Sequence, residues 1–103
     1  MNMKSIVLEH KNDYENKKDF QLAVMKGKVL LNAINTKVLY AIENETNKTK
    51  LKSELKSNLQ IVDEYLKFTY LIFINESQDS NKPLLTLVMK YIAIKEFIES
   101  HLL

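Results

Sequence analysis

The sequence contains no cysteine, no tryptophan and no arginine, and it has a single glycine and a single proline. Without cysteine there can be no disulfide, thiolate nucleophile or cysteine-ligated metal centre, which fits the reducing cytoplasm where we expect this protein. All-β domains need frequent turns that contain glycine or proline, so the near absence of both residues favours helices. We therefore expect stability to come from helix packing.

Long apolar runs are also missing. No segment without a charged residue is longer than the eight residues of 68–75, whereas a membrane-spanning helix needs about 20 predominantly apolar ones. Near the amino terminus only Ile6, Val7 and Leu8 form an apolar run, and a secretion signal needs roughly 7–15 such residues. The sequence therefore predicts neither an export signal nor a transmembrane segment.

The composition is that of a soluble globular protein. The chain has 103 residues, of which 46% are hydrophobic and 27% are charged, and its formal net charge is +2. These fractions are close to the averages for folded soluble domains. The length suits one domain covering residues 1–103 and leaves little room for an enzyme with separate cofactor and substrate lobes.

Apolar periodicity is clearest between Lys18 and Asn44. Seven positions repeat at spacings of four and three residues, which places them along one side of a helix. They are Phe20, Val24, Gly27, Leu31, Ile34, Val38 and Ala41. Glycine inside a helix costs roughly 1 kcal/mol relative to alanine, so Gly27 needs a reason. Either a close approach of a neighbouring element or a kink would supply one.

A second long helix is predicted to begin near Lys48, after a polar turn over residues 43–49 that is rich in helix-capping side chains. Its apolar positions again recur every three or four residues: Leu51, Leu55, Leu59, Val62, Leu66, Tyr70 and Phe73. Residues 68–74 are apolar on nearly all sides and would also suit a buried strand. Helix is favoured because the segment continues the helical register without a breaker.

The clearest loop covers residues 75–83 and ends in Pro83, a residue suited to the first turn of a helix. A last helix of about 20 residues is predicted to follow. The apolar positions of its first face are Leu84, Leu87, Val88, Tyr91, Ile94 and Ile98, with Leu85, Ile92 and Leu102 off that stripe.

At the other end of the chain, i, i+3, i+4, i+7 spacing predicts a short amphipathic helix that ends near Tyr14. Its apolar side consists of Met3, Ile6, Val7 and His10. The predicted fold is therefore all-α. It is a small antiparallel helical bundle of two long helices forming a hairpin, a third C-terminal helix and a short N-terminal helix.

No residue pattern predicts a catalytic, cofactor-binding or metal site. His10 and His101 are the only imidazoles, and neither belongs to a motif that places two metal ligands on one helix face. A single glycine cannot build a phosphate-binding loop. The adjacent acids Asp63 and Glu64 point about 100° apart on a helix. We therefore expect a protein that is not an enzyme and uses no cofactor.

Four lysines at the start of the second long helix could contact phosphate groups: Lys48, Lys50, Lys52 and Lys56. However, the net charge is small, Glu54 interrupts the cluster, and arginine, the usual bidentate reader of phosphate and guanine, is absent. A nucleic-acid-associated regulator is therefore the alternative interpretation.

The favoured interpretation rests on surplus apolar residues in segments 66–74 and 84–98, which exceed the single stripe that each helix of a small bundle needs. A central helix could absorb the surplus; otherwise another protein or a second copy of the chain must cover it. Candidate contact residues, unless they prove to be core, are Tyr65, Phe68, Tyr70, Phe73, Leu85, Tyr91 and Ile92.

Two resemblances to known families can be drawn. Short length, abundant lysine and asparagine, the absence of cysteine and four predicted helices resemble the immunity proteins of pediocin-like bacteriocins, which bind a target complex to protect the producing cell. A twelve-residue segment is similar in spacing to part of the flagellar export chaperones, through Phe68, Leu71, Asn75 and Asp79. Neither establishes a family. The expected role is an inhibitor, immunity protein or adaptor of a bacterium, phage or plasmid.

Overall fold

The computed structural model describes residues 3–17, 19–75 and 81–103, with side chains for residues 5–16, 19–72 and 82–103. The described residues form four helices: α1 (Met3–Lys17), α2 (Phe20–Asn44), α3 (Lys48–Asn75) and α4 (Asn81–Leu102). The prediction of an all-helical fold is confirmed.

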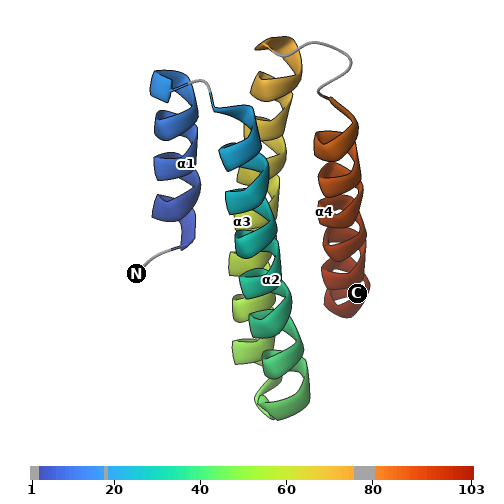
Figure 1. The fold of residues 1–103 in the computed structure, drawn as a ribbon. Helices are drawn as coiled ribbons and strands as arrows, with labels where there is room; N and C mark the ends of the chain where they lie inside the picture. The colour runs from blue at the N-terminus through green and yellow to red at the C-terminus, as the bar shows by residue number, and fades with distance from the viewer. Residues whose placement is uncertain (1–2, 18, 76–80) are drawn as a thin grey trace.

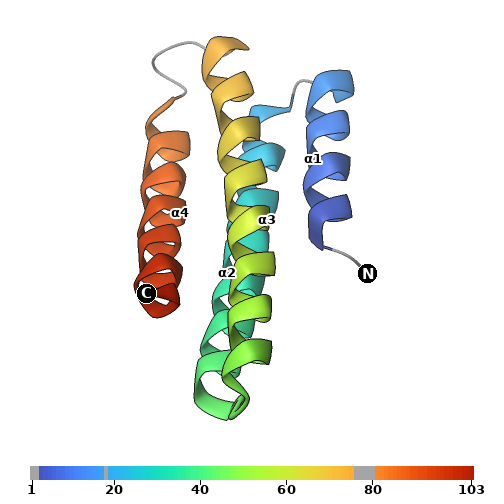
Figure 2. The ribbon, with the colours of Figure 1, turned by 180° about the vertical axis from the view of Figure 1, so that it is seen from behind.

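The helices α2 and α3 lie side by side and run in opposite directions, and they extend beyond both other helices at the end where they are joined (Figure 1). The shorter helices α1 and α4 lie on opposite sides of this pair, as the view from behind also shows (Figure 2). Each contacts both α2 and α3, and no contact between α1 and α4 is found in the described part of the chain. One side of α4 therefore faces away from the other helices.

Side-chain caps explain where the long helices begin. The Asp19 carboxylate accepts a hydrogen bond from the Leu22 amide at 3.0 Å, and the Asn47 side chain accepts from the amides of Thr49 and Lys50 at 3.0 and 3.2 Å. These bonds satisfy amide groups that have no partner within the helix. Because Asn47 caps α3 so closely, the turn between α2 and α3 is shorter than predicted and covers only residues 45–47.

The other boundaries differ from the predictions by small amounts. Helix α1 extends to Lys17, three residues beyond the predicted end at Tyr14. Helix α3 continues through residues 68–74, so the strand alternative is wrong for that segment. Helix α4 begins at Asn81, before Pro83, while residues 76–80 of the predicted loop lie outside the described residues.

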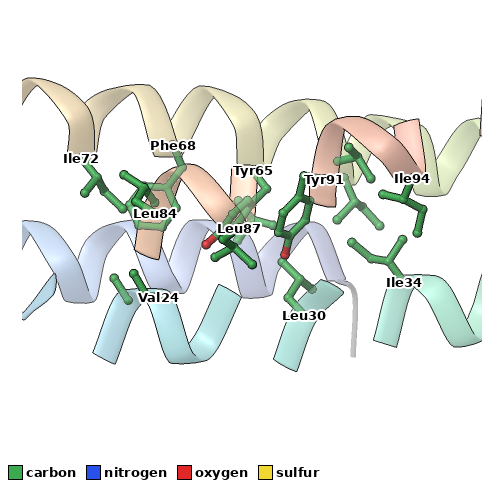
Figure 3. Close-up of a cluster of buried hydrophobic side chains, with 14 of the residues drawn as sticks. Val24, Leu30, Ile34, Tyr65, Phe68, Ile72, Leu84, Leu87, Tyr91 and Ile94 are labelled. Atoms are coloured by element: carbon green, nitrogen blue, oxygen red, sulfur yellow. The ribbon is translucent and has the colours of Figure 1, made fainter. Parts of the chain in front are cut away.

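The core forms where α2, α3 and α4 meet (Figure 3). On α2 and α4, the buried positions largely follow the predicted apolar stripes. On α3 the buried face is rotated: Tyr65, Phe68 and Thr69 are buried, whereas Leu66 is half-buried and Tyr70 is exposed. Helix α1 covers one side of this face and packs Tyr14 edge-on against Phe68, with ring centroids 6.1 Å apart.

Gly27 lies where two tyrosines enter the core. A Cβ atom at this position would overlap the hydroxyl of Tyr65 and would lie 2.7 Å from a methyl group of Leu87. The rings of Tyr65 and Tyr91 stack with centroids 4.2 Å apart, and the Tyr91 hydroxyl donates a hydrogen bond of 2.6 Å to the Gly27 carbonyl. A close approach to α2 therefore explains the glycine.

Candidate protein-binding surface

Three of the predicted contact residues belong to the core. Tyr65, Phe68 and Tyr91 are 0%, 2% and 0% exposed, so in this fold they cannot contact a partner. The two tyrosines are buried because Gly27 leaves room for their rings, and Phe68 is buried because α1 covers it. Burial also raises the pKa of both tyrosines well above the ordinary value, which keeps their hydroxyls neutral. The side chain of Phe73 lies outside the described residues.

The other predicted contact residues are on the surface. Tyr70 on α3 is 69% exposed, and Leu85 and Ile92 on α4 are 51% and 41% exposed. Met89, which the sequence analysis did not select, is 63% exposed and lies between Leu85 and Ile92 along α4. We call these four residues the α3–α4 apolar surface.

An ion pair between α3 and α4 shows which residues of the two helices lie at the same level. The Lys95 ammonium lies 3.0 Å from the Asp63 carboxylate. Helices α3 and α4 run in opposite directions (Figure 2). One helical turn from this pair, toward the C-terminus of α3 and the N-terminus of α4, Leu66 and Ile92 are therefore at the same level, and one turn further Tyr70 and Val88 are at the same level. Leu66 and Val88 are half-buried. Tyr70 and Leu66 therefore lie on the side of α3 that borders α4, next to Lys95.

Paired charges border the surface at one end. Lys67 lies 3.5 Å from Glu64 on α3, and the hydrogen bond and attraction between Lys95 and Asp63 raise the Lys95 pKa. Asp63, Leu66, Lys67, Tyr70 and Lys95 line an open depression between the helices. An apolar centre with a polar rim is the usual anatomy of a protein-binding surface.

Exposed apolar residues on α2 are more scattered. Met25 and Val29 are one turn apart, but polar Asn32 and Thr36 separate them from Tyr40 along the outer side of the helix. Single exposed apolar side chains are common on folded proteins and need no partner. Met25 is nearly as exposed as Met89, so it provides a matched control for that residue.

The two histidines do not lie in comparable surroundings. His10 borders a small cavity between α1 and α2, near an ion pair of 2.7 Å between Lys26 and Asp13. Its Nδ1 atom is buried without a hydrogen-bond partner among the described residues. Burial, followed by the charge of Lys26, lowers the His10 pKa below its ordinary value. His101 lies near the carboxyl end of α4, with Nδ1 2.9 Å from the Phe97 carbonyl oxygen.

The four candidate phosphate-binding lysines are all exposed, but they do not share one face of α3. Lys52 and Lys56 border the same shallow depression with polar neighbours. Lys50 is turned away from Lys52 by about 160°, because two residues correspond to roughly 200° of helical rotation, and it lies 3.5 Å from Glu45. The helix therefore separates Lys50 from the other lysines.

No match to the chain is found among protein-family models, curated proteins or solved structures. No helix in the described part of the chain combines the length and the apolar character needed to cross a membrane. Within the same residues, no three potential ligands among histidine, cysteine and acidic side chains are grouped so that they could hold a metal ion.

Proposed function

We propose that this protein is a non-enzymatic binding module that docks a helix of a protein partner on the α3–α4 apolar surface. The supporting observation is that Tyr70, Leu85, Met89 and Ile92 are all large, apolar and between 41% and 69% exposed. Removing apolar area from water stabilises a complex by roughly 25 cal/mol per Å² before the costs of association. Inhibitor, immunity and adaptor roles need only such binding, and a cytoplasmic bacterial setting remains our prediction.

A helix is the element that suits this surface. Leu85, Met89 and Ile92 are spaced by four and three residues, so they form a ridge along the outer side of α4. Such a ridge packs into the groove between side chains of a second helix. Tyr70 on α3 is the fourth exposed apolar side chain and would contact the flank of that helix with its ring.

The test compares the wild-type protein with Met89→Lys and Met25→Lys as baits in extracts of the cells that make the protein. Both changes place a lysine at an exposed methionine, but only Met89 lies on the α3–α4 apolar surface. We expect Met89→Lys to lose protein partners that Met25→Lys and wild type retain, with equal thermal stability for all three. Identical sets of partners for the three baits would contradict the proposal.

The alternative, nucleic-acid binding through Lys48, Lys52 and Lys56, makes a different prediction. Phosphate contacts release counterions, so binding to a DNA or RNA duplex would weaken steeply with salt concentration. Apolar docking would change little over the same range. Partners that are lost after Lys52→Glu and in moderate salt, but kept after Met89→Lys, would favour this alternative.

A further inference from the structure

One stripe of side chains on the outer side of α4 has a positive charge at one end and a negative charge at the other. It consists of Lys82, Leu85, Met89, Ile92 and Glu96, and all five side chains are exposed. Their spacing of three, four, three and four residues has a mean of 3.5, the repeat that keeps a seam of side chains facing another helix in a coiled coil. The buried side of α4 lies elsewhere, at Leu84, Leu87, Tyr91, Ile94 and Ile98.

We propose that the helix docked on this stripe is α4 of a second copy of the chain, packed antiparallel about a two-fold axis at Met89. This inference rests on the proposed function and names its partner. In that arrangement Lys82 of each copy faces Glu96 of the other, Leu85 faces Ile92, and Met89 faces Met89. Each surface residue therefore meets a chemically suitable residue, as an interface between identical surfaces requires.

The order of charges selects the antiparallel arrangement. Two α4 helices packed in parallel would place Lys82 against Lys82 and Glu96 against Glu96, and like charges facing each other disfavour a contact. The antiparallel arrangement converts both pairs into attractions. Helix α4 is also accessible, because it lies at one edge of the molecule with α1 on the far side (Figures 1 and 2).

The test is sedimentation equilibrium, from micromolar to millimolar concentration, of the wild-type protein and of variants in which one charge of the stripe is reversed. Lys82→Glu and Glu96→Lys each replace two attractive pairs of the dimer by two repulsive pairs, so each variant alone should dissociate at least about tenfold more readily than wild type. An equal mixture of the two variants restores both attractions and should associate as wild type does. The double variant K82E/E96K should also regain wild-type association.

Lys90→Glu is the matched control, because it makes the same charge change on α4 away from the stripe. It should dimerise like wild type, whereas Met89→Lys should be monomeric with unchanged thermal stability. A wild-type chain that stays monomeric at millimolar concentration would overturn the dimer, as would single-charge variants that associate as wild type does. If that monomer still loses its captured partner after Met89→Lys, the proposed function stands while the dimer fails.

Discussion

At the scale of single residues, the contact between Gly27, Tyr65 and Tyr91 decides how closely α2 approaches α3 and α4. Tyr91 satisfies its hydroxyl with the Gly27 carbonyl, but the buried Tyr65 hydroxyl has no hydrogen-bond partner among the described residues. A buried polar group without a partner costs free energy. The two tyrosines therefore differ: both fill the core, and only Tyr91 has a hydrogen bond that holds its hydroxyl in place.

The first prediction concerns Gly27→Ala, which should lower the free energy of unfolding by about 2 kcal/mol, because the added methyl group overlaps Tyr65 and Leu87. The higher helix propensity of alanine, worth roughly 1 kcal/mol, offsets only part of this cost. Tyr65→Phe removes the nearest atom and should change stability by less than about 1 kcal/mol. Urea unfolding of both variants and of the double variant checks this.

The double variant should be more stable than Gly27→Ala alone, because the two changes act at one contact and are not additive. If Gly27→Ala were as stable as wild type, the close packing described for α2 would be incorrect. Additive losses in the double variant would show that the Tyr65 hydroxyl is not the group that excludes a side chain at position 27.

At the scale of helices, the buried positions of α2 and α4 largely follow the predicted stripes, whereas the buried face of α3 is rotated. The stripes of α2 and α4 were predictable because each helix buries one side, and residues such as Val24, Ile34 and Leu87 mark it by spacing alone. Helices α2 and α3 each contact three neighbours, but only on α3 does the buried face differ from the predicted stripe. A one-position rotation from Leu66 to Tyr65 exchanges one apolar residue for another, so spacing could not detect it.

The pairing of α1 with α2 should weaken in acid. The lowered pKa of His10 means that the folded protein disfavours the charged imidazole near Lys26, while Glu9 and Asp13 oppose the shift. This contribution to stability is complete above the unfolded pKa of about 6.5 and is lost as pH falls, by at most about 1.4 kcal/mol per pH unit. Denaturant unfolding at pH about 7 and about 5 measures it.

His10→Gln is the control for this pH dependence, because glutamine is polar and does not titrate. The variant should lose less stability than wild type between the two pH values, since the carboxylates that also titrate are common to both proteins. Equal losses would show that His10 contributes nothing to the acid sensitivity of the α1–α2 pairing.

At the scale of the whole molecule, the two sides of α4 have different surroundings. Its inner side completes the core, and its outer side carries Leu85, Met89 and Ile92 in contact with water. The surplus of apolar residues in segments 66–74 and 84–98 is thus divided. Phe68 and Tyr91, together with the neighbouring Tyr65, belong to the core, and the exposed residues form the proposed docking surface.

Part of this division could be predicted. Leu85 and Ile92 stood out because they lie off the core stripe of α4, and Met89 has the same spacing but was overlooked beside the denser apolar pattern of the inner face. Tyr91 lies on the predicted core stripe of α4, but the burial of Tyr65 could not be predicted, because it depends on the space that Gly27 of α2 leaves for its ring. Helical periodicity reports which side a residue faces and not which neighbour covers it.

The most direct test of the docking surface is methyl NMR of the full-length protein with isotope-labelled methionine, recorded over a concentration series. Met89 and Met25 are 63% and 57% exposed and report on α4 and α2 under the same conditions. The Met89 signal should shift or broaden as the concentration rises, while the Met25 signal stays unchanged. A Met89 signal that is independent of concentration, or equal changes at both methionines, would contradict self-association through α4.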